Sequence, residues 1–135
     1  MDLDFSSEEE AFREEVRAFL RDEMPAEFRQ KADAGEHFEH HETTRWQKIL
    51  HTRGWAAPHW PKQHGGSELD PTRRFILSEE LALAGTPALS PFGLSMVGPL
   101  IIHYGTPEQQ ARYLPGIVSG ETAWCQGYSE PNAGS

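Results

Sequence analysis

The feature that most constrains the fold of this chain is a helix-start signal that recurs along its length. Near the N-terminus, Ser6 or Ser7 can form a capping box with the glutamate three residues further on. Pro25 then ends the helix. Asp70–Pro71 and Thr106–Pro107 repeat the start signal, each as an N-cap followed by proline. The apolar residues that share one face of the first helix are Phe12, Val16, Phe19 and Leu20.

The segments between these starts also have helical patterns. Apolar spacing and terminal glycines predict further helices at about 39–53, 71–85 and 90–105. The sequence therefore predicts an all-α fold, an orthogonal bundle of about five to six helices in a domain covering 1–120. The pattern changes over 121–135, where ETAWCQGY predicts a strand and the following turn-rich loop suggests the beginning of a β region.

The 54–70 segment is long for a loop and is rich in proline, glycine and tryptophan. We expect Trp55 and Trp60 to pin it to the helices. Gly93 and Gly98 lie inside a predicted helix, where each costs about 1 kcal/mol relative to alanine. Glycine at these positions indicates that another group packs closely against the backbone.

Composition excludes several classes of protein. The net charge of −9, with 14 of the 21 Asp and Glu within residues 1–42, argues against nucleic-acid binding, which needs a basic face. The longest apolar stretch, 94–102, is about half of what a membrane span requires. The N-terminus has no secretory signal, and Cys125, the single cysteine, allows no internal disulfide. We therefore expect a cytoplasmic protein.

Three histidines near residue 40 form a candidate metal site. His37 and His41 are four residues apart and could share a metal on a helix. Their neighbours, including His40, are polar, which favours solvent-exposed side chains. We predict no metal site.

Three motifs carry a resemblance to a known family. They are QGYSEPNAGS at 126–135, WPKQHGG at 60–66 and YGTPEQQARYLPGIVSGE at 104–121. The first resembles the acyl-CoA dehydrogenase signature, in which Thr or Ser precedes Glu-Pro-x-Ala-Gly-Ser. The other two resemble segments of the same family, in the same order and at similar intervals. The likeness covers nearly the whole chain.

The resemblance implies that FAD binds at the C-terminal tail. Gln126, Tyr128 and Ser129 would lie at the flavin ring, with the Ser129 hydroxyl near N5 or O4. Gly134 and Ser135 would face the pyrophosphate, and Ser135 would also meet the thioester arm of the substrate. Extended backbone amides, one hydroxyl and small residues suit these contacts.

The implied reaction is α,β-dehydrogenation of an acyl-CoA thioester, with hydride passing to N5 of FAD. In the family the acyl chain lies against the helix that matches 92–101, so Leu94 and Val97 are substrate-binding candidates, although ordinary helix packing is the stronger explanation for each residue taken singly. The catalytic base is a glutamate that we expect beyond residue 135. We assign Glu130 to loop structure and not to catalysis.

The resemblance also implies partners. One is electron-transferring flavoprotein, as the electron acceptor. The others are further subunits, which would form a homo-oligomer (tetramer or dimer) or a heteromer with a related chain. Because the sequence stops inside the signature loop, we expect a truncated protein that is inactive alone. Three alternatives stay open: an acyl-CoA oxidase-like relative, a nitroalkane oxidase-like relative, and a non-catalytic partner subunit or helical interaction module.

Overall fold

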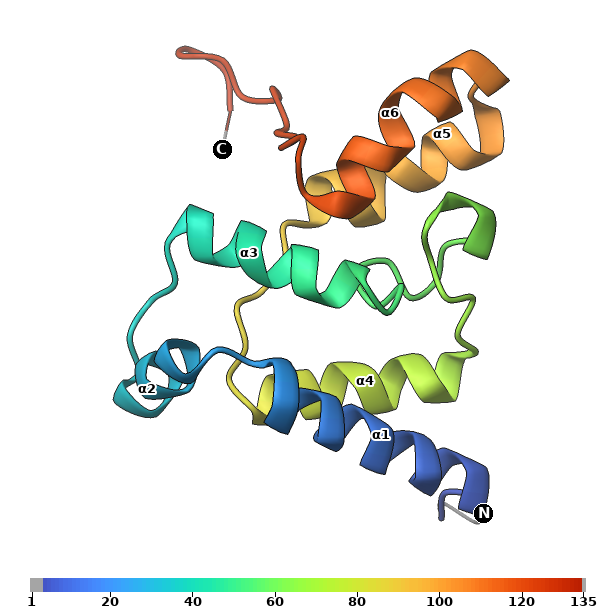
Figure 1. Cartoon of the computed structure of the whole chain (residues 1–135). Coiled ribbons are helices and arrows are strands. Elements are labelled where there is room, and N and C mark those ends of the chain that lie inside the picture. Colours follow the sequence, from blue (N-terminus) through green and yellow to red (C-terminus); the bar gives the residue numbers. More distant parts are fainter. Residues whose placement is uncertain (1–3, 135) are drawn as a thin grey trace.

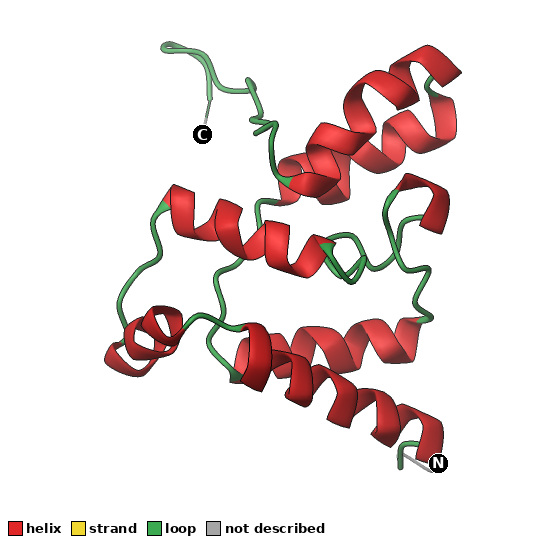
Figure 2. Cartoon of the chain, viewed as in Figure 1, coloured by secondary structure: helices red, strands yellow, loops and turns green. Residues whose placement is uncertain are grey.

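The computed structural model describes residues 4–134, and this part of the chain contains helices, turns and loops but no strand (Figure 2). The all-α class and the predicted number of helices are confirmed. No helix within the described range is long and apolar enough to cross a membrane. The elements are α1 (Ser7–Glu23), α2 (Ala26–Ala34), α3 (His40–His51), the 3-10 turn η1 (Lys62–His64), α4 (Pro71–Leu83), the π-helical segment η2 (Phe92–Val97), α5 (Gly98–Tyr104) and α6 (Pro107–Ser119).

The helices form two groups with α3 between them (Figure 1). α1 and α4 lie side by side at one edge, and α5 and α6 pair at the other. Each group has its own apolar core, and Leu89, in the connection between α4 and η2, packs against both. The most buried members of the first core include Val16, Phe28, Trp46, Leu50 and Ile76, and those of the second include Trp60, Leu114, Ile117 and Val118.

The predicted helix starts are confirmed. The Glu9 amide donates to Ser6 Oγ at 3.3 Å, and Glu9 Oε2 accepts from the Ser6 amide at 2.7 Å. Asp70 Oδ1 caps α4 by accepting from the Arg73 amide at 2.9 Å. Thr106 forms the third cap, with Gln109 as its capping-box partner. These starts could be predicted because the cap and its partner are three residues apart.

Helix α2 was not predicted from the sequence. Pro25, expected only to end α1, also stands at the N-cap of α2, and Phe28 is the one buried residue of this short helix. Arg29 fixes α2 to α1, because its Nη2 donates to the carbonyls of Leu20, Arg21 and Met24 at 2.8–2.9 Å. With one buried residue in nine, α2 has too little apolar periodicity to be predicted from sequence.

The predicted 90–105 helix is continuous but begins in the π pattern. Gly98 N–H donates to Gly93 O, five residues back. In that pattern Leu94 O would accept from residue 99, but Pro99 has no N–H. Trp60 Nε1 donates to Leu94 O instead, at 2.9 Å. The expectations that Trp60 pins its loop and that a group packs against Gly98 are both confirmed, since a Cβ at Gly98 would lie 2.0 Å from Trp60 Cζ2.

The strand predicted at 121–128 is wrong for the described residues. The backbone of this segment makes one backbone hydrogen bond among the described residues, from Thr122 N–H to Gly116 O of α6, and the β-type contact that follows is an isolated bridge between Glu130 and Ala133. A strand needs backbone partners on a neighbouring strand. The described part of the chain contains none.

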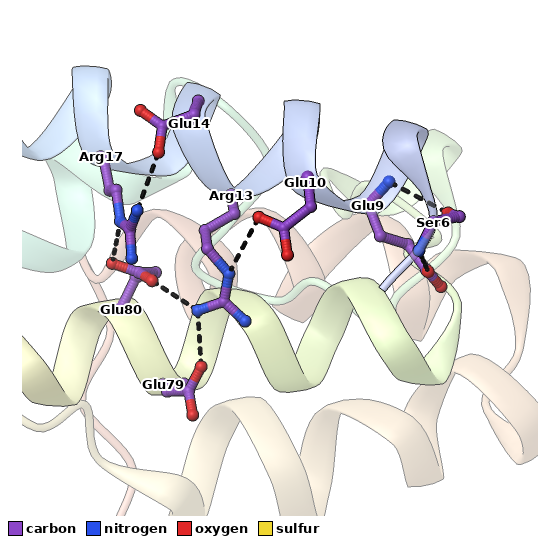
Figure 3. Close-up of polar contacts among 8 residues, drawn as sticks. All are labelled: Ser6, Glu9, Glu10, Arg13, Glu14, Arg17, Glu79 and Glu80. Atoms are coloured by element: carbon purple, nitrogen blue, oxygen red, sulfur yellow. Dashed lines mark hydrogen bonds and ion pairs between the residues drawn. The ribbon is translucent and has the colours of Figure 1, made fainter. Parts of the chain in front are cut away.

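An ion-pair network joins α1 to α4 (Figure 3). Arg13 Nη1 donates to Glu79 and to Glu80 at 2.6 Å each, and Arg17 Nε donates to Glu80 at 3.0 Å. Arg13 and Glu80 are both buried. Burial alone would raise the pKa of the Glu80 carboxyl, but the hydrogen bonds and charges of Arg17 and Arg13 together hold that pKa below its ordinary value.

Replacing Glu80 by glutamine is expected to lower the free energy of unfolding by about 1–3 kcal/mol, because two arginines lose a charged acceptor. Because the folded-state pKa of Glu80 is depressed, its contribution is present above the unfolded pKa and is lost as pH falls through the folded value. Chemical denaturation between pH 7 and pH 3 should therefore show that the free energy of unfolding falls less with acid in the variant than in the unmutated protein. Glu14→Gln, at an exposed partner of Arg17, is the control and should change little.

Replacing Gly98 by alanine is expected to destabilise the protein by about 1–3 kcal/mol, because the new Cβ would overlap Trp60 Cζ2. Helix propensity alone favours alanine by about 1 kcal/mol, so the clash must outweigh it. Gly127→Ala is the matched control, since nothing lies within 4 Å of its Cβ position. An unchanged or raised melting temperature for Gly98→Ala would contradict this packing.

Candidate functional site

The C-terminal tail, which carries most of the predicted site, leaves α6 in a fixed direction (Figure 1). Gly120 ends α6 with a φ of +80°, a conformation that glycine adopts without strain. Thr122 N–H then donates to Gly116 O at 3.0 Å. Gln47, buried on α3, donates from Nε2 to the carbonyls of Ile117 at 2.8 Å and Val118 at 3.3 Å. The exit of the tail is therefore fixed by bonds to both α3 and α6.

Gln47 was missed by sequence reasoning. Glutamine is a common residue on exposed helix faces, and its position beside Trp46 gives no sign that its amide caps another helix. A Cβ at Gly120 would lie 3.1 Å from Gln47 Cδ, so the glutamine also packs against the turn that starts the tail. Only the tertiary fold brings residues 47 and 117 together.

A hollow of about 210 Å³ lies between α3, η2 and the start of the tail. Its lining includes Gln47, Gly93, Leu94 and Trp124. Gly93 allows the close approach, because a Cβ there would be 3.0 Å from Ile117 Cγ2 and 3.5 Å from Trp124 Cδ1. The hollow is mostly apolar, and no carboxylate is among its described lining residues. Its apolar lining suits an apolar ligand group.

The structure separates the two predicted acyl-binding residues. Leu94 is 5% exposed and lines the hollow. Val97 does not line it and packs, partly buried, against the second core. The two positions are three residues apart, but the π pattern sets them at different angles from those of an α-helix.

The end of the tail folds into a tight turn. Glu130 N–H donates to Ala133 O at 2.8 Å, and Ala133 N–H donates to Glu130 O at 3.1 Å. The turn brings Gly134 against Ser129, where a Cβ on residue 134 would be 2.9 Å from Ser129 Oγ. Glu130 thus has the loop-forming role expected of it. Two of the predicted cofactor-binding residues, Ser129 and Gly134, are brought together.

The other predicted cofactor-binding residues stand apart from this pair. Gln126 and Tyr128 are exposed, with 84% of Tyr128 accessible to solvent. Their backbone amides donate to no backbone carbonyl among the described residues. Ser135 lies outside the described residues. The tail therefore presents an aromatic ring, free amides and one hydroxyl on a backbone that is bonded to α6 at its start and forms a local turn near its end.

The predicted surface position of the three histidines is confirmed. His37, His40 and His41 are all exposed. No group of three or more His, Cys, Asp or Glu side chains among residues 4–134 is arranged to hold a metal ion.

Comparisons with known proteins agree on one family. Residues 6–121 match the model described as acyl-CoA dehydrogenase, N-terminal domain. Acyl-CoA dehydrogenase IpdE1 of Mycolicibacterium smegmatis is 42% identical over 133 residues, which are 95% of this chain and 34% of the relative. The protein of the same name from Mycobacterium tuberculosis is 40% identical, over 93% of this chain and 34% of the relative.

Solved structures give the same result. A structure named Tcur3481-Tcur3483 steroid ACAD has a TM-score of 0.76 and 37% identity, covering 99% of this chain and 34% of that chain. The ChsE4-ChsE5 complex from Mycobacterium tuberculosis has a TM-score of 0.77 and 31% identity, with the same coverage. The chain spans about a third of the length of the curated relatives that it matches.

Replacing Gln47 by leucine is expected to lower the free energy of unfolding by about 1–3 kcal/mol, because the carbonyls of Ile117 and Val118 lose a buried donor. Amide hydrogen exchange should accelerate most at 117–124. Gln63→Leu is the matched control, because the side chain of this exposed glutamine hydrogen-bonds to His64 and caps no helix among the described residues. Equal exchange at 117–124 in both variants would show that Gln47 does not fix the tail.

Proposed function

Because the chain belongs to the acyl-CoA dehydrogenase family and matches its N-terminal domain, we propose that it is part of an FAD-dependent oxidoreductase acting on an acyl-CoA thioester. In this proposal residues 1–120 form the helical domain, and 121–135 begin the domain that follows it. The proposed reaction removes a proton from the α carbon and a hydride from the β carbon. The base is a carboxylate outside this chain, consistent with the absence of one from the described lining of the hollow.

The observation that carries the proposal is the turn at 130–133, which sets the Ser129 hydroxyl against Gly134 inside the signature motif. The fit to a flavin can be tested on these residues. A side chain at residue 134 would fill the space beside Ser129 Oγ, so this position suits close approach of a ligand to the backbone. The backbone amides of Gln126 and Tyr128 are free to donate hydrogen bonds to acceptor atoms along the edge of a planar ring. The residues present therefore fit the group.

We assign the following roles to the tail. Ser129 would donate a hydrogen bond from its hydroxyl toward N5 or O4 of the ring, while Gln126 and Tyr128 would contribute backbone and ring contacts. Gly134 and Ser135 would contact the pyrophosphate, and Ser135 would also contact the thioester arm. The bound flavin would supply the hydride acceptor. Gln47 and Gly120 contribute indirectly, by fixing where the tail leaves α6.

The hollow beside η2 is our candidate for part of the acyl site. Leu94 and Trp124 give it apolar walls, and Gly93 allows Ile117 and Trp124 to lie close to the η2 backbone. We give Val97 a supporting role, because it packs against the second core next to Leu94. The similar structure named as a steroid ACAD favours a steroid-type acyl group as the substrate class.

The similar solved structures also bear on assembly. One is named as a complex of two different chains, and another carries two chain names. We therefore propose a heteromer with a related subunit, with a homo-oligomer as the alternative. We also propose that electron-transferring flavoprotein is the electron acceptor and that the protein is cytoplasmic. An experiment must also separate three alternatives: an oxidase-like reaction, a nitroalkane oxidase-like reaction, and a non-catalytic subunit.

The decisive experiment uses the full-length protein with its partner subunit. We expect a yellow flavoprotein whose absorbance bleaches when acyl-CoA is added without oxygen, and more readily with steroid-type than with straight-chain acyl groups. Ser129→Ala should slow the bleaching by about 10-fold or more, because a donor to the flavin is lost. Ser7→Ala, at the exposed start of α1, is the control.

Each reading gives a different result. A flavin that stays oxidised with every acyl-CoA tested rules out the dehydrogenase. Rapid consumption of oxygen favours the oxidase-like alternative, and bleaching by a nitroalkane favours the nitroalkane oxidase-like one. A protein that binds no FAD with its partner present supports the non-catalytic subunit.

A further inference from the structure

One side chain packs the tail that follows α6 into an apolar core. From Glu121 to Gly134 every residue is exposed except Trp124, which is partly buried. Figure 1 shows that the tail otherwise extends away from the helices. The ring of Trp124 packs against the second core and meets Tyr113 edge-on, with 5.9 Å between the two ring centroids. Trp124 is therefore the apolar anchor of the tail.

Packing alone holds the Trp124 ring in place. Its Nε1 is buried and has no hydrogen-bond partner within residues 4–134. The ring lies close to η2 instead, since a Cβ at Gly93 would be 3.5 Å from Trp124 Cδ1. Because the indole N–H makes no bond there, this position contributes the size and shape of the ring to the site, and not its polarity.

The same ring forms a wall of the hollow between α3, η2 and the start of the tail, together with Leu94 and Ile117. The volume of the hollow is about 210 Å³. Small-molecule sites have roughly 300–1,000 Å³, so the hollow can hold only part of an acyl group. Extra methylene groups in a packed apolar space force unfavourable shifts of its walls. A wall as large as an indole ring therefore limits how wide that part can be.

Trp124 is also next to the proposed flavin-binding segment. Gln126, the first residue of that segment, is two residues further along the chain. Two residues span at most about 7 Å of backbone, so the wall of the hollow and the start of the flavin segment must lie close together. An acyl group whose reacting carbons meet the flavin is therefore within reach of the Trp124 ring.

We infer that Trp124 is a specificity-determining residue, which excludes wide acyl groups by limiting the width of the hollow. The inference rests on the proposed dehydrogenase function and deepens it. It gives Trp124 a role that is separate from flavin contact and from proton removal. A smaller side chain at residue 124 would widen the hollow and admit an acyl group that the unmutated protein rejects.

The test uses the full-length protein with its partner subunit and two probes, 5-cyclohexylpentanoyl-CoA and 5-(1-adamantyl)pentanoyl-CoA. The probes have the same reacting carbons and differ in the width of the terminal ring. The readout is the ratio of their rate constants for flavin bleaching without oxygen, at low probe concentration. Trp124→Ala should shift this ratio toward the adamantyl probe about 10-fold or more, because an apolar pocket discriminates to this extent for a single methylene. Trp124→Phe should shift it less, in the same direction.

Cys125→Ala is the matched control, because Cys125 is exposed and does not line the hollow. It should leave the ratio unchanged. Equal slowing of both probes in Trp124→Ala overturns the inference and means that Trp124 only anchors the tail. If that variant binds no FAD, the ratio in Trp124→Phe decides, and an unchanged ratio there overturns the inference too. A flavin that stays oxidised with every acyl-CoA in the unmutated protein shows instead that the proposed function is wrong.

Discussion

The hydrogen bond from Trp60 to the Leu94 carbonyl is the interaction on which the second half of the domain depends. It exists because Pro99 lacks the N–H that would otherwise meet this carbonyl in a π-helical turn. Gly98 then allows the indole to lie against the helix backbone. Through this contact the loop before α4 fixes η2, and η2 in turn forms one wall of the hollow that we assign to the acyl group.

Elsewhere, helices are joined at their C-terminal ends. Arg29 of α2 caps the last carbonyls of α1, Gln110 of α6 caps those of α5, and Gln47 of α3 caps those of α6. A helix end leaves carbonyls without partners, so a donor from another helix satisfies them and sets the angle between the two elements. The cap from Gln47 matters most for function, because α6 leads directly into the tail.

The site has a rigid base and an open tail. Bonds to α3 and α6 hold the start of the tail, and the 130–133 turn shapes its end, while Tyr128 between them is largely exposed. This arrangement suits a segment that contacts a cofactor on one face. The helical body beneath offers an apolar hollow, lined in part by Gln47 of α3 and Leu94 of η2.

The helix starts at Ser6, Asp70 and Thr106, the all-α class and the family could be predicted from the sequence, because caps and signature motifs are local patterns. Tertiary structure decided the rest. The π-helical turn and the role of Gln47 depend on hydrogen bonds between residues distant in sequence, and α2 depends on side-chain bonds from Arg29 to the end of the preceding helix. The expected strand failed for the same reason, since extended backbone becomes a strand only when another strand supplies its partners.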